Sequence, residues 1–179
     1  MNLPNKITLF RVFLIPVFLI LLLVPQIPNG RIFAAAVFIF AALTDLLDGY
    51  LARKNNLVTN FGKFMDPIAD KLLVSSALIC FVELGQLPAW IVIIIISREF
   101  IISGFRLVAS DNGIVIAASR WAKIKTTIQM IMSVMLIIDL DYTFINILEQ
   151  IVIYLAVVLT IISLLEYLVK NKKVISEKN

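Results

Sequence analysis

TDLLDGYLARKNNLVTNFGKFMDPIADK, residues 44–71, gathers four aspartates in a chain that is 61% hydrophobic. Asp45 and Asp48 are three residues apart, so a helix would carry both on one face. Asp66 and Asp70 are four residues apart and would share a face in the same way. Only a short connection separates the two predicted helices, which makes them antiparallel neighbours. We therefore expect the four carboxylates to converge.

The 179-residue chain as a whole is too apolar for a soluble domain, with a mean hydropathy of +1.00. Its length suits one domain, over residues 1–179. Six apolar runs predict an all-α membrane protein with six transmembrane helices. These runs are residues 12–25, 32–43, 72–82, 89–96, 128–138 and 151–165. All are shorter than the roughly 20 residues that span a bilayer, and only the last, extended to residue 169, comes close. The polar flanks of the others must therefore belong to the same helices, where charged residues are usually functional.

Basic residues cluster at the two chain ends and at alternate connections between the apolar runs. The positive-inside rule then places both termini in the cytoplasm. Residues 44–71 would then lie at the cytoplasmic face of the membrane. The net charge of +4 favours anionic head groups and phosphorylated substrates, and we expect no nucleic-acid partner.

Four converging carboxylates repel one another and must be neutralised. Oxygen ligands suit Mg²⁺, Mn²⁺ or Ca²⁺, and a cluster of two ions that bridges substrate phosphates fits the ligand count. Gly49 and Ala52 would let a ligand approach the helix backbone, and Arg53 could face a phosphate. The alternative is a set of buried ion pairs between the two helices, which accounts for one or two of the charges.

Eight positions of the segment follow the pattern D-x₂-D-G-x₂-A-R-x₈-G-x₃-D-x₃-D. In this pattern the chain resembles the CDP-alcohol phosphatidyltransferase family. The resemblance implies six transmembrane helices, a homodimer and a cavity open to the cytoplasm. It also implies transfer of a phosphatidyl group from CDP-diacylglycerol to an alcohol, with release of CMP, in a bacterial cytoplasmic membrane.

The resemblance assigns roles to individual positions of this chain. Asp45, Asp48 and Asp66 match metal ligands, with Mg²⁺ or Mn²⁺ as the expected ions. Asp70 matches the general base and also lies near the metals. The positions expected to contact CDP-diacylglycerol are Gly49, Arg53, Thr59 and Gly62.

Two further stretches indicate the class of acceptor. SREFIISGFR contains Arg98 and Arg106, and WAKIKTTIQ contains Lys123 and Lys125. Several cations near one chamber favour a phosphorylated alcohol, and we expect Arg106, Lys123 and Arg98 to bind its phosphate. Alternatively, Arg98 pairs with Glu99 or with a neighbouring helix, and Lys125 faces lipid phosphates.

NLPNKITLFRVFLIP, residues 2–16, presents Asn5, Thr8 and Arg11 at intervals of three. Together with the two basic stretches, it resembles bacterial members of the family whose acceptor is glycerol 3-phosphate. The resemblance implies that this segment helps to close the nucleotide site, so we assign the three side chains to CDP. Simple anchoring at the membrane interface is the alternative.

Two other functions remain open. The same fold could use another acceptor, such as inositol phosphate. In a different class of protein, the aspartates could line the ion path of a divalent-cation transporter. A transporter needs polar residues across the whole membrane, whereas residues 32–42 and 77–82 carry no charge. A purely structural protein would leave the register of the carboxylates unexplained.

Overall fold

The computed structural model describes residues 3–54, 60–111 and 119–171. It gives the backbone alone for residues 3–5, 45–54, 60–67, 70, 110 and 111. All regular structure in the described residues is α-helical, which confirms the predicted fold class. The helices are α1 (Leu3–Leu23), α2 (Gly30–Lys54), α3 (Asn60–Glu83), α4 (Ala89–Asp111), α5 (Arg120–Ile138) and α6 (Thr143–Lys170).

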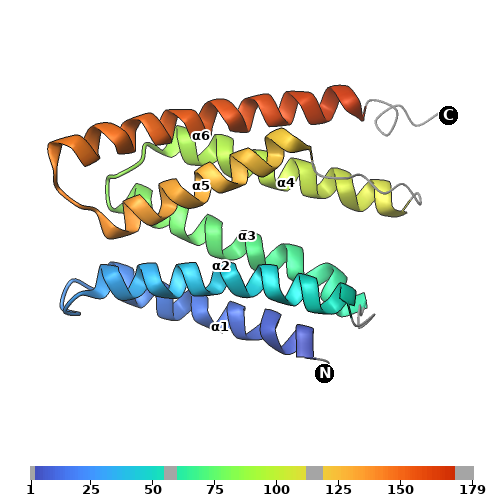
Figure 1. The fold of residues 1–179 in the computed structure, drawn as a ribbon, viewed down its shortest axis with the longest axis horizontal. Coiled ribbons are helices and arrows are strands. Elements are labelled where there is room, and N and C mark those ends of the chain that lie inside the picture. The colour runs from blue at the N-terminus through green and yellow to red at the C-terminus, as the bar shows by residue number, and fades with distance from the viewer. Residues whose placement is uncertain (1–2, 55–59, 112–118, 172–179) are drawn as a thin grey trace. The chain divides into compact units, whose positions relative to one another are not determined.

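Unit 1 comprises Met1–Gln86 together with Val134–Asp139, the last turns of α5. The consecutive helices α1, α2 and α3 run antiparallel to one another, and α1 packs against both α2 and α3 (Figure 1). The rings of Phe18 and Phe38, both fully buried, lie 5.7 Å apart between α1 and α2. Apolar side chains of this size supply the main favourable energy of packing.

Small residues on α2 allow its close approach to α1. Ala34, Ala35 and Ala41 are buried along one stripe of α2. Gly30 is buried at the start of that helix, where a Cβ atom would lie 2.6 Å from the carbonyl oxygen of Leu21. The contact between these helices therefore depends on the absence of a side chain at residue 30.

Unit 2 comprises Leu87–Ser133 and Leu140–Asn179, which contain α4, most of α5 and α6. α4 packs against α6, and Phe105 and Tyr167 join them in an edge-to-face contact with ring centroids 6.1 Å apart. The buried apolar residues include Ile95 on α4 and Ala156 on α6. This core also buries several polar side chains: Arg98, Lys125, Gln129, Ser133, Thr160 and Ser163.

Two chain reversals in unit 1 have local explanations. α3 ends in a pair of hydrogen bonds in which Gly85 donates to Val82 and Gln86 donates to Phe81. Gly85 has a φ of 72°, as this type of helix end requires. Asn29, before α2, also has a positive φ, of 56°, which Asn tolerates better than most side chains.

Large apolar side chains cover the outside of the helices. Phe13 on α1 and Phe144 on α6 are 66% and 76% exposed, and many more Leu, Ile, Val and Phe residues share this state. Such a surface suits lipid rather than water. Three described helices are long and apolar enough to span a membrane: Lys6–Leu23, Arg120–Ile138 and Thr143–Lys170. A further apolar stretch, Gly30–Thr44, is shorter.

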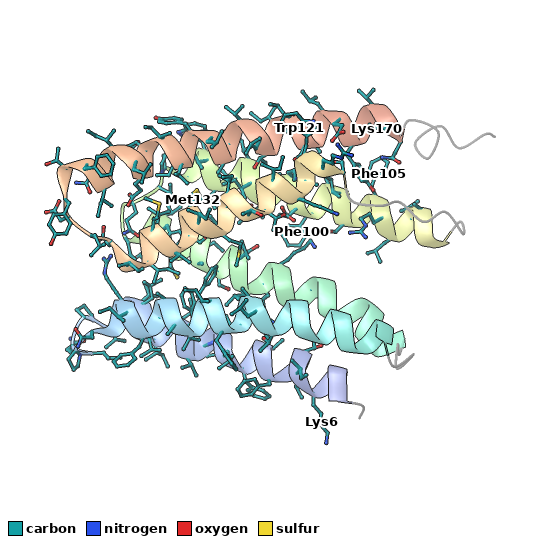
Figure 2. All side chains as sticks on the ribbon, viewed as in Figure 1. Lys6, Phe100, Phe105, Trp121, Met132 and Lys170 are labelled. Carbon is teal, nitrogen blue, oxygen red and sulfur yellow. The ribbon has the colours of Figure 1, made fainter. Side chains whose placement is uncertain are left out.

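Interfacial residues lie at one end of unit 2. Trp121 in the first turn of α5 and Lys170 in the last turn of α6 lie toward the same end (Figure 2). Both side chains are exposed. Tryptophan and lysine at helix ends are typical of the boundary between lipid and water. This pattern supports a membrane protein, while the count of six spans stays a prediction.

Candidate active site

The four aspartates lie on the two helices predicted to carry them. Asp45 and Asp48 are in the last three turns of α2, and Asp66 and Asp70 are in the first three turns of α3. The end of α2 and the start of α3 are at the same end of unit 1 (Figure 1). The backbone therefore brings the two acidic segments together. The side chains of these four residues lie outside the described part of the structure, so their convergence at atomic distances stays a prediction.

The predicted nucleotide contacts lie in the same segments. Gly49 and Arg53 are in α2, and Gly62 is in α3. Thr59, in the connection, falls outside the described residues, as does the side chain of Asn5. The helical backbone of α2 is consistent with a shared face for Asp45, Asp48, Gly49 and Arg53, because residues at these spacings are neighbours on a helix.

The N-terminal end of α1, whose first three turns contain Thr8 and Arg11, lies at this end of unit 1 (Figure 1). Thr8 and Arg11 are both 1% exposed, in a helix that packs against α2 and α3. Burial of both disagrees with simple anchoring at the membrane surface, where the two side chains would be exposed. A buried guanidinium is costly unless it is paired, so Arg11 is suited to an anionic group within this unit.

Unit 2 contains a buried cluster of charges that joins its three helices. Arg98 on α4 is 5% exposed and donates through NH1 to Oε1 of Glu99, 3.1 Å away. Lys125 on α5, 1% exposed, donates to the same oxygen. Nε of Arg98 donates to Oγ of Ser163 on α6 at 3.1 Å. The ion pairs and hydrogen bonds within the cluster offset the high free-energy cost of burying these charges.

The other predicted acceptor ligands are exposed. Arg106 lies two turns after Arg98 on α4, and Lys123 lies in the first turn of α5. Both side chains are accessible in unit 2, as is that of Arg120. The three predicted ligands thus differ in character, since one is held inside the unit and two are exposed.

The structure changes the interpretation of two residues and adds a third. The predicted alternative for Arg98, a pair with Glu99 or with a neighbouring helix, is confirmed, because Arg98 bonds both to Glu99 and to Ser163 on α6. The alternative that Lys125 faces lipid phosphates is wrong, because its side chain is buried against Glu99. Ser163 was not singled out by sequence reasoning. Its one signal is a pair of hydroxyls, with Thr160, in the otherwise apolar residues 155–165 of α6.

The chain is similar to known proteins over most of its length. A family model for CDP-alcohol phosphatidyltransferase matches residues 1–162. A CDP-diacylglycerol–glycerol-3-phosphate 3-phosphatidyltransferase of Bacillus subtilis is 47% identical and is aligned over 99% of each chain. Proteins of the same name from Haemophilus influenzae and Rickettsia bellii are 43% and 36% identical. The former alignment covers 93% of this chain and 91% of the relative, and the latter covers 96% of each. The chain therefore belongs to the CDP-alcohol phosphatidyltransferase family.

Proposed function

We propose that this protein transfers the phosphatidyl group of CDP-diacylglycerol to sn-glycerol 3-phosphate, giving phosphatidylglycerophosphate and CMP. The observation that carries the proposal is the position of the two acidic segments at one end of unit 1, where α2 ends and α3 begins. Relatives that carry the name of this activity align over nearly the whole chain. These names also disfavour the divalent-cation transporter.

The carboxylates fit a divalent metal centre. Asp45, Asp48, Asp66 and Asp70 supply only oxygen ligands, on helices that adjoin at their polar ends. We infer that they hold two ions, Mg²⁺ or Mn²⁺. When bound, such ions neutralise the pyrophosphate and stabilise the charge on departing CMP.

The residues around this centre have separate tasks in the proposed reaction. Asp70 takes the proton from the acceptor hydroxyl. The acceptor oxygen then forms a bond to the β-phosphorus, which bears the diacylglycerol, and the bond from that phosphorus to CMP breaks. The acyl chains stay in lipid while the head group reacts. The nucleotide is held by Gly49, Arg53, Thr59 and Gly62, with Asn5, Thr8 and Arg11 from the N-terminal segment.

The acceptor phosphate is bound by cations of unit 2. Arg106 and Lys123 are exposed and free to reorient, whereas Arg98 is fixed by its partners. A charge-assisted hydrogen bond from a guanidinium suits a phosphate oxygen. Serine, which has no phosphate, would need fewer cations than a phosphorylated alcohol.

The setting of the reaction is part of the proposal. We place the protein in a bacterial cytoplasmic membrane with six spans, both termini in the cytoplasm, and a polar cavity open to that side. It acts as a homodimer in this scheme. The exposed apolar side chains of the described helices support the membrane location.

Release of CMP by the purified protein in detergent micelles tests the function. CDP-diacylglycerol and Mg²⁺ are supplied, and glycerol 3-phosphate, inositol phosphate and serine are offered separately. We expect release with glycerol 3-phosphate alone. Release with inositol phosphate alone would support the proposed phosphatidyl transfer but show that the acceptor is inositol phosphate. No release from folded protein with any acceptor would refute the proposed activity.

A further inference from the structure

Arg98 is held from two sides by side chains of different helices. Its NH1 donates to Glu99 in the next position of α4, and its Nε donates to Ser163 on α6, both at 3.1 Å. A guanidinium is planar and carries five N–H donors. These two bonds fix the plane of the group, and the NH2 nitrogen takes part in neither of them.

Ser163 can act only as the acceptor in its hydrogen bond with Arg98. Its hydroxyl is fully buried, and its single proton is donated to the backbone carbonyl of Thr160 at 3.0 Å. The lone pairs of Oγ are therefore left to receive the Nε–H of Arg98. Because a hydroxyl bonded to the preceding turn cannot rotate freely, Ser163 sets the direction from which Arg98 is held.

Glu99 restrains the Arg98 guanidinium less than Ser163 does. Its Oε1 oxygen also receives the proton of Lys125, so its charge is divided between two cations. Its side chain is 23% exposed, while that of Ser163 is fully buried. A bond to a buried, immobile partner restricts the guanidinium more than one to a shared and partly exposed carboxylate.

We propose that Ser163 is a positioning residue for acceptor recognition. It holds the Arg98 guanidinium so that NH2 is available to the phosphate of the alcohol acceptor. This inference rests on the proposed function, in which Arg98 binds that phosphate. It adds α6 to the elements that determine acceptor affinity, although no residue of α6 touches the acceptor in this scheme.

The test compares two substitutions on α6. Ser163→Ala removes the acceptor of the Arg98 bond, and we expect the KM for glycerol 3-phosphate to rise about three- to tenfold, with the KM for CDP-diacylglycerol and kcat within about twofold. Ser163→Thr keeps a hydroxyl, so its KM for glycerol 3-phosphate should be close to that of the wild-type protein. Thr160→Val is the matched control. It removes a buried hydroxyl that donates only to Ala156 in the preceding turn, and leaves the Thr160 carbonyl in place.

A double substitution separates positioning from general damage to the helix. Lysine has no Nε–H in a guanidinium plane, so Ser163→Ala should add less than about twofold to the KM of Arg98→Lys if the serine acts through Arg98. A full effect in the Arg98→Lys background would overturn the proposal. So would an unchanged KM in Ser163→Ala alone, or an equal rise in KM for both substrates.

Direct binding keeps this test independent of turnover. Binding of glycerol 3-phosphate to the same purified variants is measured by titration calorimetry, and the Kd should change by the same factors as the KM. A protein that binds glycerol 3-phosphate but releases no CMP would refute the proposed function alone. A wild-type protein that binds no glycerol 3-phosphate would overturn the positioning role.

Discussion

Lys125 on α5 donates a hydrogen bond through Nζ to Oε1 of Glu99 on α4, across 26 residues of sequence. Lysine is almost never as buried as it is here, at 1% exposure, unless it is paired. Because the same oxygen accepts from Arg98, one carboxylate serves two cations. Glu99 therefore connects the two buried cations Arg98 and Lys125.

Glu99→Gln should destabilise unit 2, because it leaves two buried cations without their shared carboxylate. Loss of one partner of a fully buried pair costs about 3–5 kcal/mol, and the partial exposure of Glu99 lowers our expectation to about 2 kcal/mol. Reversible unfolding in mixed micelles would measure this loss. Asp139→Asn is the control, since its pair with Arg31 is exposed and should contribute less than about 1 kcal/mol. Equal effects of the two substitutions would contradict the role of Glu99.

Asp70→Asn should abolish turnover while the protein still folds and binds CDP-diacylglycerol. An amide cannot take the proton of the acceptor, and loss of a general base lowers the rate about 10²- to 10⁴-fold. Initial rates of CMP release and binding of CDP-diacylglycerol would be measured on the same preparation. Asp141→Asn, at an exposed residue hydrogen-bonded to Asn146, should be fully active. Near-normal rates in Asp70→Asn would exclude it as the base.

Removal of divalent metal should stop the reaction. The proposed ligands are all carboxylates, which would repel one another and the pyrophosphate without cations. Rates of CMP release would be measured in excess chelator and again after Mg²⁺ or Mn²⁺ is restored. We expect loss and full recovery. Sustained turnover in excess chelator would show that the aspartates act without metal.

Arg106→Ala should raise the KM for glycerol 3-phosphate more than that for CDP-diacylglycerol. A hydrogen bond to a charged group contributes about 1.5–3 kcal/mol, so we expect a rise of roughly tenfold or more. Arg120→Ala is matched to it, because Arg120 is also an exposed arginine of unit 2 but is not assigned to the acceptor. A larger effect on the lipid substrate would remove Arg106 from the acceptor site.

Replacing Gly30 or Gly104 by alanine should change the free energy of unfolding in opposite directions. Gly30→Ala brings a Cβ atom to 2.6 Å from a backbone oxygen, and such overpacking costs about 1–3 kcal/mol. At Gly104, in the interior of α4, a Cβ atom meets nothing within 4 Å, and alanine should stabilise the helix by about 0.5–1 kcal/mol. Unfolding measurements on both variants would show the contrast, and a stable Gly30→Ala protein would contradict the close approach of α1 and α2.

Local spacing was sufficient to place the acidic segments. The intervals between Asp45 and Asp48, and between Asp66 and Asp70, identify helical faces, and the short connection between them predicts adjoining helix ends. The structure puts these segments at the end of α2 and the start of α3. Such inferences succeed because helical periodicity and chain connectivity are local properties.

The surroundings of Lys125 could not be predicted in this way. Its neighbours in sequence, Lys123 and Thr126, are exposed, and nothing in the segment distinguishes a buried lysine from an exposed one. The partner is Glu99, on another helix. Whether a charge is buried depends on how two helices are rotated against each other, which is a property of packing and not of either segment alone.

The helical membrane character, the family and the acidic segments were predictable from the amino-acid sequence, since apolar length, residue spacing and a local motif carry this information. The hydrogen bond from Arg98 to Ser163 of α6, 65 residues away, depends instead on the folded arrangement of the helices. A hydroxyl in an apolar helix has many possible partners, and the packing of α4 against α6 selects one of them. The physical reason is that a hydrogen bond needs a separation near 3 Å, which the folded chain alone can provide between such distant residues.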